Sequence, residues 1–138
     1  MASDLHAAGE NVSRPARLET VVVSTNNKGK LAEVRSALAF DGWEFVSAGE
    51  LEPEWQSPVE DGETFEDNAR IKAQAAHERF ALASLADDSG LEVDALDGEP
   101  GVHSSRYAGE CATDADNNER LLLALAGVPD EARTARFR

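Results

Sequence analysis

The chain has 138 residues, of which 41% are hydrophobic, and this length and composition favour one globular domain with a core of its own. Its formal net charge of −14 would repel the phosphate backbone of DNA or RNA, so a nucleic-acid polymer is excluded as the expected partner. No apolar run approaches the ~20 residues that a membrane span needs. The single cysteine, Cys111, fits a reducing cytoplasm.

Residues 1–17 have no continuous apolar segment, and we expect a disordered leader before an α/β domain over residues 18–138. The β-branched run Val21-Val22-Val23 predicts a buried strand that leads into a helical pattern. The junction contains hydroxyl, amide, glycine and lysine residues: Thr25, Asn26, Asn27, Lys28, Gly29 and Lys30. Because α/β proteins bind anions at such junctions, this loop is predicted to bind phosphate.

Three segments follow the loop. Apolar residues from Leu31 to Leu38 recur at helical spacing, and Asp41-Gly42 predicts the end of that helix. Residues 43–47 alternate apolar and polar side chains, which predicts a second strand. Residues 50–67 carry two prolines and many acids, so we expect a loop whose charges mostly face solvent.

A longer helix is predicted to begin after Thr64, which can cap it together with Asp67. Apolar residues then recur on one side from Phe65 to Phe80. Lys72 lies nearly two turns after Phe65, so its stem should leave the helix close to the apolar side. Two interpretations stay open: a lysine that extends past the edge of the core, or a cation directed at a cleft.

Residues 82–86 predict a third strand, which runs directly into Asp87-Asp88-Ser89-Gly90. Neighbouring side chains in a strand point to opposite faces, so the two aspartates are expected to have different roles. One could bind a metal ion or water while the other orients the turn. The alternative is an ordinary Asp-rich turn before a strand predicted over residues 91–96.

The last part of the chain carries weaker signals. Arg106 could meet a phosphate or a carboxylate, although an ordinary salt bridge is the commoner explanation. Neither His77 nor His103 has a partner at metal-ligand spacing. A final helix is predicted to begin at Thr113 with Asp116 as its capping partner, and to stop at a glycine and a proline.

Three of these features together indicate phosphoryl chemistry. A lysine-containing loop can hold a polyphosphate, the Asp87-Asp88 pair can hold a divalent cation, and Lys72 can neutralise the remaining charge. Crowded phosphate oxygens must be neutralised before water can attack phosphorus. Mg²⁺ is the expected cofactor, because it prefers hard oxygens and is commonly held by carboxylates and substrate phosphates. The loop lacks the G-x-x-x-x-G-K-[ST] pattern of a Walker motif.

Five segments in order resemble the inosine triphosphate pyrophosphatase family. Residues 25–30 match its T-x-N-x-x-K pattern, residues 62–72 its G-x-T-F-x-[ED]-N-A-x-x-K pattern and residues 86–91 its A-D-D-S-G-L pattern. The later matches are Pro100-Gly101 with Ser104-Ser105-Arg106-Tyr107, and Val128-Pro129-Asp130. The resemblance implies a mixed sheet flanked by helices, and hydrolysis of dITP, ITP and XTP by attack at the α-phosphorus. The products would be the nucleoside monophosphate and pyrophosphate.

The resemblance also implies roles for single residues. The loop from Thr25 to Lys30 would bind the triphosphate, with Asn27 and Lys30 as its strongest contacts. Lys72 would contact phosphate, and Ser89 would touch the substrate.

The remaining implied roles belong to acidic residues. Asp88 would act as the general base on the attacking water and as a metal ligand. Glu60 matches the family's other metal-binding acid, with neighbouring Asp61 as the alternative. Asp87 would support the metal shell.

Members of this family continue past the position matched by Arg138 with strands that bind the purine base. We therefore expect an N-terminal part of the domain, truncated at its C-terminus, with weak or no activity by itself. The base preference cannot be assigned to any residue present. The resemblance further implies a small-molecule nucleoside triphosphate as partner, a homodimer and a cytoplasmic location. Two alternatives stay open: a domain that only binds phosphate and Mg²⁺, and a Maf-type pyrophosphatase, which the T-x-N-x-x-K pattern disfavours.

Overall fold

The computed structural model describes residues 17–138, so the predicted leader lies outside the described residues except for Arg17. Strands and helices alternate along the chain in the following order: β1 (Glu19–Val23), α1 (Lys28–Ala37), β2 (Trp43–Ser47), α2 (Ala48–Leu51), α3 (Phe65–Phe80), β3 (Ala83–Leu85), β4 (Leu91–Val93), α4 (Asp114–Ala124) and β5 (Ala135–Phe137). Short 3₁₀ helices cover Asp94–Leu96, Gly101–Arg106 and Asp130–Ala132. The predicted α/β class is confirmed.

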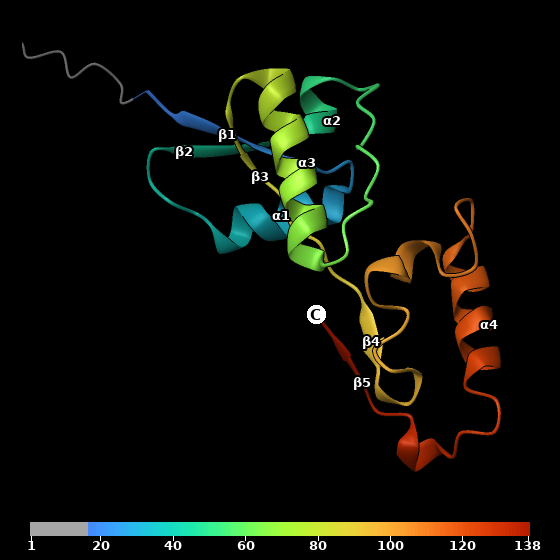
Figure 1. The fold of residues 1–138 in the computed structure, drawn as a ribbon. Coiled ribbons are helices and arrows are strands. Elements are labelled where there is room, and N and C mark those ends of the chain that lie inside the picture. The colour runs from blue at the N-terminus through green and yellow to red at the C-terminus, as the bar shows by residue number, and fades with distance from the viewer. Residues whose placement is uncertain (1–16) are drawn as a thin grey trace, which may run out of the picture.

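Strand β1 lies at the centre of a parallel three-stranded sheet with the order β2-β1-β3. One hydrophobic cluster joins α1 to one face of this sheet: Val21, Val23, Leu31 and Phe45. A second cluster joins α2 and α3 to the opposite face: Val22, Ala48 and Ala76. Because the three strands are parallel, the segments that follow β1 and β3 leave the sheet at the same edge (Figure 1).

The second part of the structure comprises residues 91–138. Strands β4 and β5 pair antiparallel, and α4 contacts the 3₁₀ helix Gly101–Arg106. Figure 1 shows α4 at the opposite end of the molecule from the parallel sheet, with the segment between β3 and β4 joining the two parts. Parallel and antiparallel pairing are both present, as the expected mixed sheet requires, but they occur in two separate sheets.

Several boundaries differ from those predicted. Helix α1 ends at Ala37, before the expected Asp41-Gly42 stop. The segment predicted as a loop from residue 50 contains the end of α2, a helix that begins at Ala48 with a reciprocal capping box between Ser47 and Glu50. The strand predicted over residues 91–96 ends at Val93, and β5 was not predicted. Among residues 17–138, no helix combines the length and the apolar character that a membrane crossing requires.

Candidate active site

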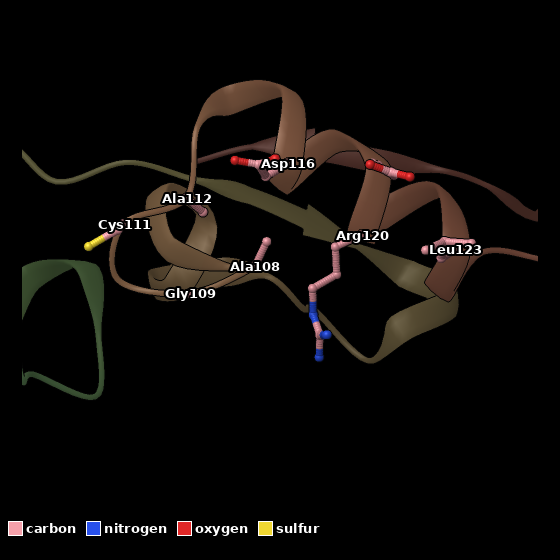
Figure 2. Close-up of a pocket in the computed structure, with 8 residues that line it drawn as sticks. Ala108, Gly109, Cys111, Ala112, Asp116, Arg120 and Leu123 are labelled. Carbon is pink, nitrogen blue, oxygen red and sulfur yellow. The ribbon is translucent and has the colours of Figure 1, made fainter.

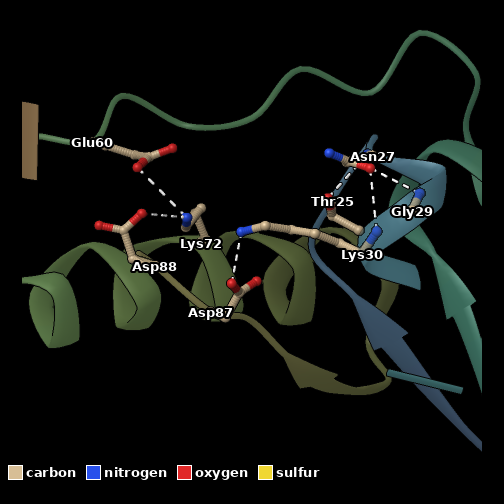
Figure 3. A network of polar contacts seen from close by, with 8 residues as sticks. All are labelled: Thr25, Asn27, Gly29, Lys30, Glu60, Lys72, Asp87 and Asp88. Atoms are coloured by element: carbon tan, nitrogen blue, oxygen red, sulfur yellow. Dashed lines mark hydrogen bonds and ion pairs between the residues drawn. The ribbon is translucent and has the colours of Figure 1, made fainter. Parts of the chain in front are cut away.

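The loop after β1 is shaped by its own side chains. Thr25 is buried, and its hydroxyl accepts a hydrogen bond from the Asn27 backbone N–H at 3.0 Å. Asn27 is the N-cap of α1, since its Oδ1 accepts from the backbone N–H groups of Gly29 and Lys30 at 2.8 and 3.2 Å. Figure 3 shows the amide nitrogen of Asn27 directed away from the helix. The predicted phosphate loop is therefore also a helix cap, and this cap occupies the Asn27 oxygen.

The two lysines of the loop extend in different directions. The Lys30 ammonium lies 2.6 Å from Asp87 Oδ2, across the edge between β1 and β3 (Figure 3). Lys28 instead lines a concavity between α1 and α2, together with Asn26 and Glu50. The Asn26 amide nitrogen donates to the Trp55 carbonyl oxygen at 3.1 Å. Of the two lysines, Lys30 is therefore the one that the structure brings to the Asp-rich segment.

Lys72 lies at the centre of the second group of charges. It is 8% exposed, although its type is among the least often buried. Its Nζ is 2.9 Å from Asp88 Oδ1 and 3.5 Å from Glu60 Oε2 (Figure 3). The lysine therefore does not carry its charge past the core into solvent. Of the two sequence interpretations, this burial disagrees with a lysine that extends past the edge of the core, and the cation directed at a cleft stays a prediction.

The adjacent aspartates contact different cations, as the expectation of separate roles requires. Asp87 pairs with Lys30, and Asp88 pairs with Lys72. The side chain of Asp87 is 55% exposed, whereas that of Asp88 is 10% exposed. Asp88 and Glu60 thus share one ammonium, and Asp87 does not join them. Ser89 follows Asp88 and is partly buried.

Two further residues hold this arrangement, and neither was given this role from the sequence. Asn68 of α3 is fully buried, and its amide contacts the Gly62 backbone and the Asp88 carboxylate. Arg106 was interpreted as a possible phosphate contact or a salt bridge. Its Nη2 donates to the Glu60 carbonyl oxygen at 2.8 Å, and its Nε lies 3.9 Å from Glu110. Only a long-range contact reveals this role, because 46 residues separate Arg106 from Glu60.

Another concavity lies in the second part of the structure, beside α4 (Figure 2). It is lined by Ala108, Gly109, Cys111, Ala112, Asp116, Glu119, Arg120 and Leu123. The Arg120 guanidinium lies over the Tyr107 ring, 5.3 Å from its centroid. Burial, followed by the Glu99 carboxylate, raises the pKa of Tyr107. None of the site residues predicted from the sequence lines this concavity, so it does not belong to the candidate active site.

Comparison with known proteins gives the family. The sequence profile of the Ham1 family matches residues 21–138. The chain belongs to the Ham1 family. A Ham1 relative from Desulforamulus reducens, named dITP/XTP pyrophosphatase, is 54% identical over 118 residues, which cover 86% of this chain and 58% of that protein.

Solved Ham1 structures agree with the fold. A HAM1 protein from Coxiella burnetii superposes with a TM-score of 0.76 at 41% identity, over 87% of this chain and 60% of that one. A nucleoside-triphosphatase / dITP/XTP pyrophosphatase from Mycobacterium abscessus gives 0.72 at 45% identity, over 86% of this chain and 61% of that one. The predicted resemblance is confirmed. This chain spans about three fifths of the length of these relatives, as the 58% to 61% coverage shows.

Proposed function

We propose that the protein carrying this chain hydrolyses dITP, ITP and XTP to the nucleoside monophosphate and pyrophosphate, and so removes these nucleotides from the nucleotide pool. One observation carries the proposal: the phosphate loop and the Lys72 centre lie at the carboxyl edge of one parallel sheet. Ligands of open α/β sheets bind outside this edge. The name dITP/XTP pyrophosphatase, carried by relatives of this chain, supports the choice of substrate.

The substrate phosphates would lie between the loop and α3. Lys30 and Lys72 are the two lysines that contact this site, and each is held by an aspartate of the segment after β3. Phosphate oxygens would compete with those aspartates for the two ammonium groups. The remaining proposed substrate contacts are Thr25, Asn26, Asn27, Lys28, Gly29 and Ser89, of which Asn27 would donate from its amide nitrogen.

A divalent cation fits the donor set of this site. Glu60 and Asp88 direct hard carboxylate oxygens at one positive centre, the Lys72 ammonium. Across residues 17–138, no three His, Cys, Asp or Glu side chains gather as a metal cluster. Mg²⁺ suits this set because it is commonly held by one or two carboxylates, with substrate phosphates and water as its other ligands. When bound, the cation would withdraw charge from the phosphate oxygens, and Asp87 would support the site through Lys30.

Asp88 is the proposed general base. In the proposed step, a water molecule attacks the α-phosphorus while its proton passes to the Asp88 carboxylate. The bond from the α-phosphorus to the bridging oxygen breaks, and pyrophosphate leaves with the electron pair. Lys30 and Lys72 would then offset the negative charge of the departing pyrophosphate.

Pyrophosphate release from dITP tests both the function and this role. Asp88→Asn should lower the rate by about 10²- to 10⁴-fold, the range that a general base contributes, without loss of the folded state by circular dichroism. Asp130→Asn is the matched control, because its side chain is 95% exposed and lies in the second part of the structure. Wild-type turnover by Asp88→Asn would refute the assigned base. If the parent protein released no pyrophosphate but gained thermal stability from Mg²⁺ and pyrophosphate, a phosphate-binding domain would be favoured.

The resemblance to the pyrophosphatases also supports a homodimer in the cytoplasm. Sedimentation velocity tests the assembly, since a single species of monomer mass across the concentration range would contradict it. Fractionation of the source cells tests the location.

A further inference from the structure

We infer that Asn68 is a positioning residue, which holds Asp88 and the segment of Glu60 in their mutual arrangement. The inference rests on the proposed function of the site. Asn68 has no exposed surface and lies on α3, one turn before Lys72. It contacts neither the phosphate loop nor the solvent, so its expected action is through its neighbours.

The two bonds of the Asn68 amide fix its orientation. Its Oδ1 accepts a hydrogen bond from the Gly62 backbone N–H at 2.8 Å. A backbone N–H can only donate, so the atom that faces it must be the amide oxygen. The amide nitrogen consequently faces Asp88 Oδ2, at 3.4 Å, and an ionised carboxylate can only accept. With the amide reversed, its NH₂ group would face the Gly62 N–H, which is also a donor. Its oxygen would face Asp88 Oδ2, which is also an acceptor.

Helix α3 therefore contacts both oxygens of Asp88. Lys72 binds Oδ1 at 2.9 Å, and Asn68 lies against Oδ2. Because residues at i and i+4 of a helix lie on one face, the two contacts approach the carboxylate from the same rigid element. Rotation of the Asp88 carboxylate would break at least one of them.

The same amide fixes the segment that carries Glu60. Gly62 packs so closely on the start of α3 that a Cβ atom there would lie 2.6 Å from Asn68 Oδ1. Arg106 also holds this segment, by a hydrogen bond to the Glu60 carbonyl oxygen. Asn68 thus joins the backbone of this segment to Asp88, beside Lys72, whose ammonium joins the two carboxylates. Its loss should loosen both carboxylates together.

A double-mutant cycle with the full chain distinguishes positioning from general structural support. Binding of pyrophosphate in the presence of Mg²⁺ is measured by titration calorimetry for Asn68→Ala, Asp88→Asn and the double variant. We expect Asn68→Ala to weaken binding about tenfold in the wild-type background and less than about twofold in the Asp88→Asn background, since residues in one network are not additive.

Asn117 supplies the matched control. It is also a buried asparagine, at 8% exposure, and its amide also bridges two segments through the Ala108 N–H and the Ser105 carbonyl oxygen. It contacts no carboxylate in these bonds. Asn117→Ala should lower the melting temperature but weaken pyrophosphate binding by the same factor in both backgrounds.

Equal losses for Asn68→Ala in the two backgrounds would overturn the inference. If the wild-type chain bound no pyrophosphate, the phosphate site proposed for this chain would fail, and the function of the parent protein would be decided separately by pyrophosphate release from dITP. The positioning role would then be decided by thermal unfolding of the metal-free and phosphate-free chain. Non-additive melting shifts for Asn68→Ala and Asp88→Asn would support it, and additive shifts would overturn it.

Discussion

Replacement of Lys72 by methionine removes the ammonium that lies between Glu60 and Asp88 while it keeps a stem of similar length. Exposed ion pairs contribute about 0–1 kcal/mol, whereas loss of one partner from a buried pair costs about 3–5 kcal/mol. The side chains of Lys72 and Asp88 are each 10% exposed, and that of Glu60 is 25% exposed. The site is thus close to the buried limit but open on the Glu60 side. We expect Lys72→Met to lower the free energy of unfolding by about 2–3 kcal/mol, between the two limits.

Urea unfolding at neutral pH measures this loss as a lower midpoint with an unchanged slope. Arg70→Met is the matched control on the same helix, because Arg70 pairs with Glu66 at 2.8 Å with both side chains largely exposed, 69% and 81%. The control should lose about 0.3–0.5 kcal/mol, as is usual for i,i+4 pairs. Equal midpoints for the two variants would refute the claim that Lys72 neutralises a buried pair of carboxylates.

Two further predictions concern the remainder of the fold. At Gly90, a Cβ atom would lie 2.6 Å from Ser104 Oγ and would also meet the Gly101 carbonyl oxygen. Gly90→Ala should therefore lower the free energy of unfolding by about 1–3 kcal/mol through overpacking. An unchanged urea midpoint would show that Gly90 packs less closely on the Gly101–Ser104 segment than described. Hydrogen bonds from Thr113, first through its side chain and then through its backbone, hold the pKa of Asp116 below its ordinary 3.8. The stability from this group is therefore complete above pH 3.8 and is lost as the pH falls through the lower folded value. The melting temperature of Asp116→Asn should be lower than that of the wild type at neutral pH and equal to it in acid. A difference in melting temperature that persisted in acid would show that the stabilisation does not come from the ionised Asp116 carboxylate.

Short sequence patterns predicted the strands and helix starts that depend on neighbouring residues. The Val21–Val23 run and its flanking loop identify β1 and the start of α1, and both expected caps, Thr64 and Thr113, begin their helices. The α2 capping box also has a sequence signature, Ser47 with Glu50, but it lies at the boundary between a strand and an acidic segment. Strand β5 has no such signal. All three of its residues are exposed, so its pairing with β4 depends on backbone contacts that hydrophobic alternation does not encode.

The candidate site was predictable in its residue types but not in its pairings. The sequence placed lysines and carboxylates in separate segments, and the structure joins them into two groups, Lys30 with Asp87, and Lys72 with Asp88 and Glu60. Which lysine meets which acid depends on the order of β1 and β3 in the sheet, and one sequence does not reveal strand order. Asn68 was part of a recognised pattern, but its amide has a role only once Gly62 and Asp88 are brought to it.

Hydrolysis of dITP in ¹⁸O-labelled water tests the central claim most directly, with the products separated and weighed by mass spectrometry. If the parent protein directs water to the α-phosphorus, the label will be in dIMP, and the pyrophosphate will be unlabelled. Label in the pyrophosphate would show that water attacks the β-phosphorus instead, which would contradict the proposed step. Release of orthophosphate with dIDP would contradict the account, because the enzyme would then cleave the terminal anhydride bond.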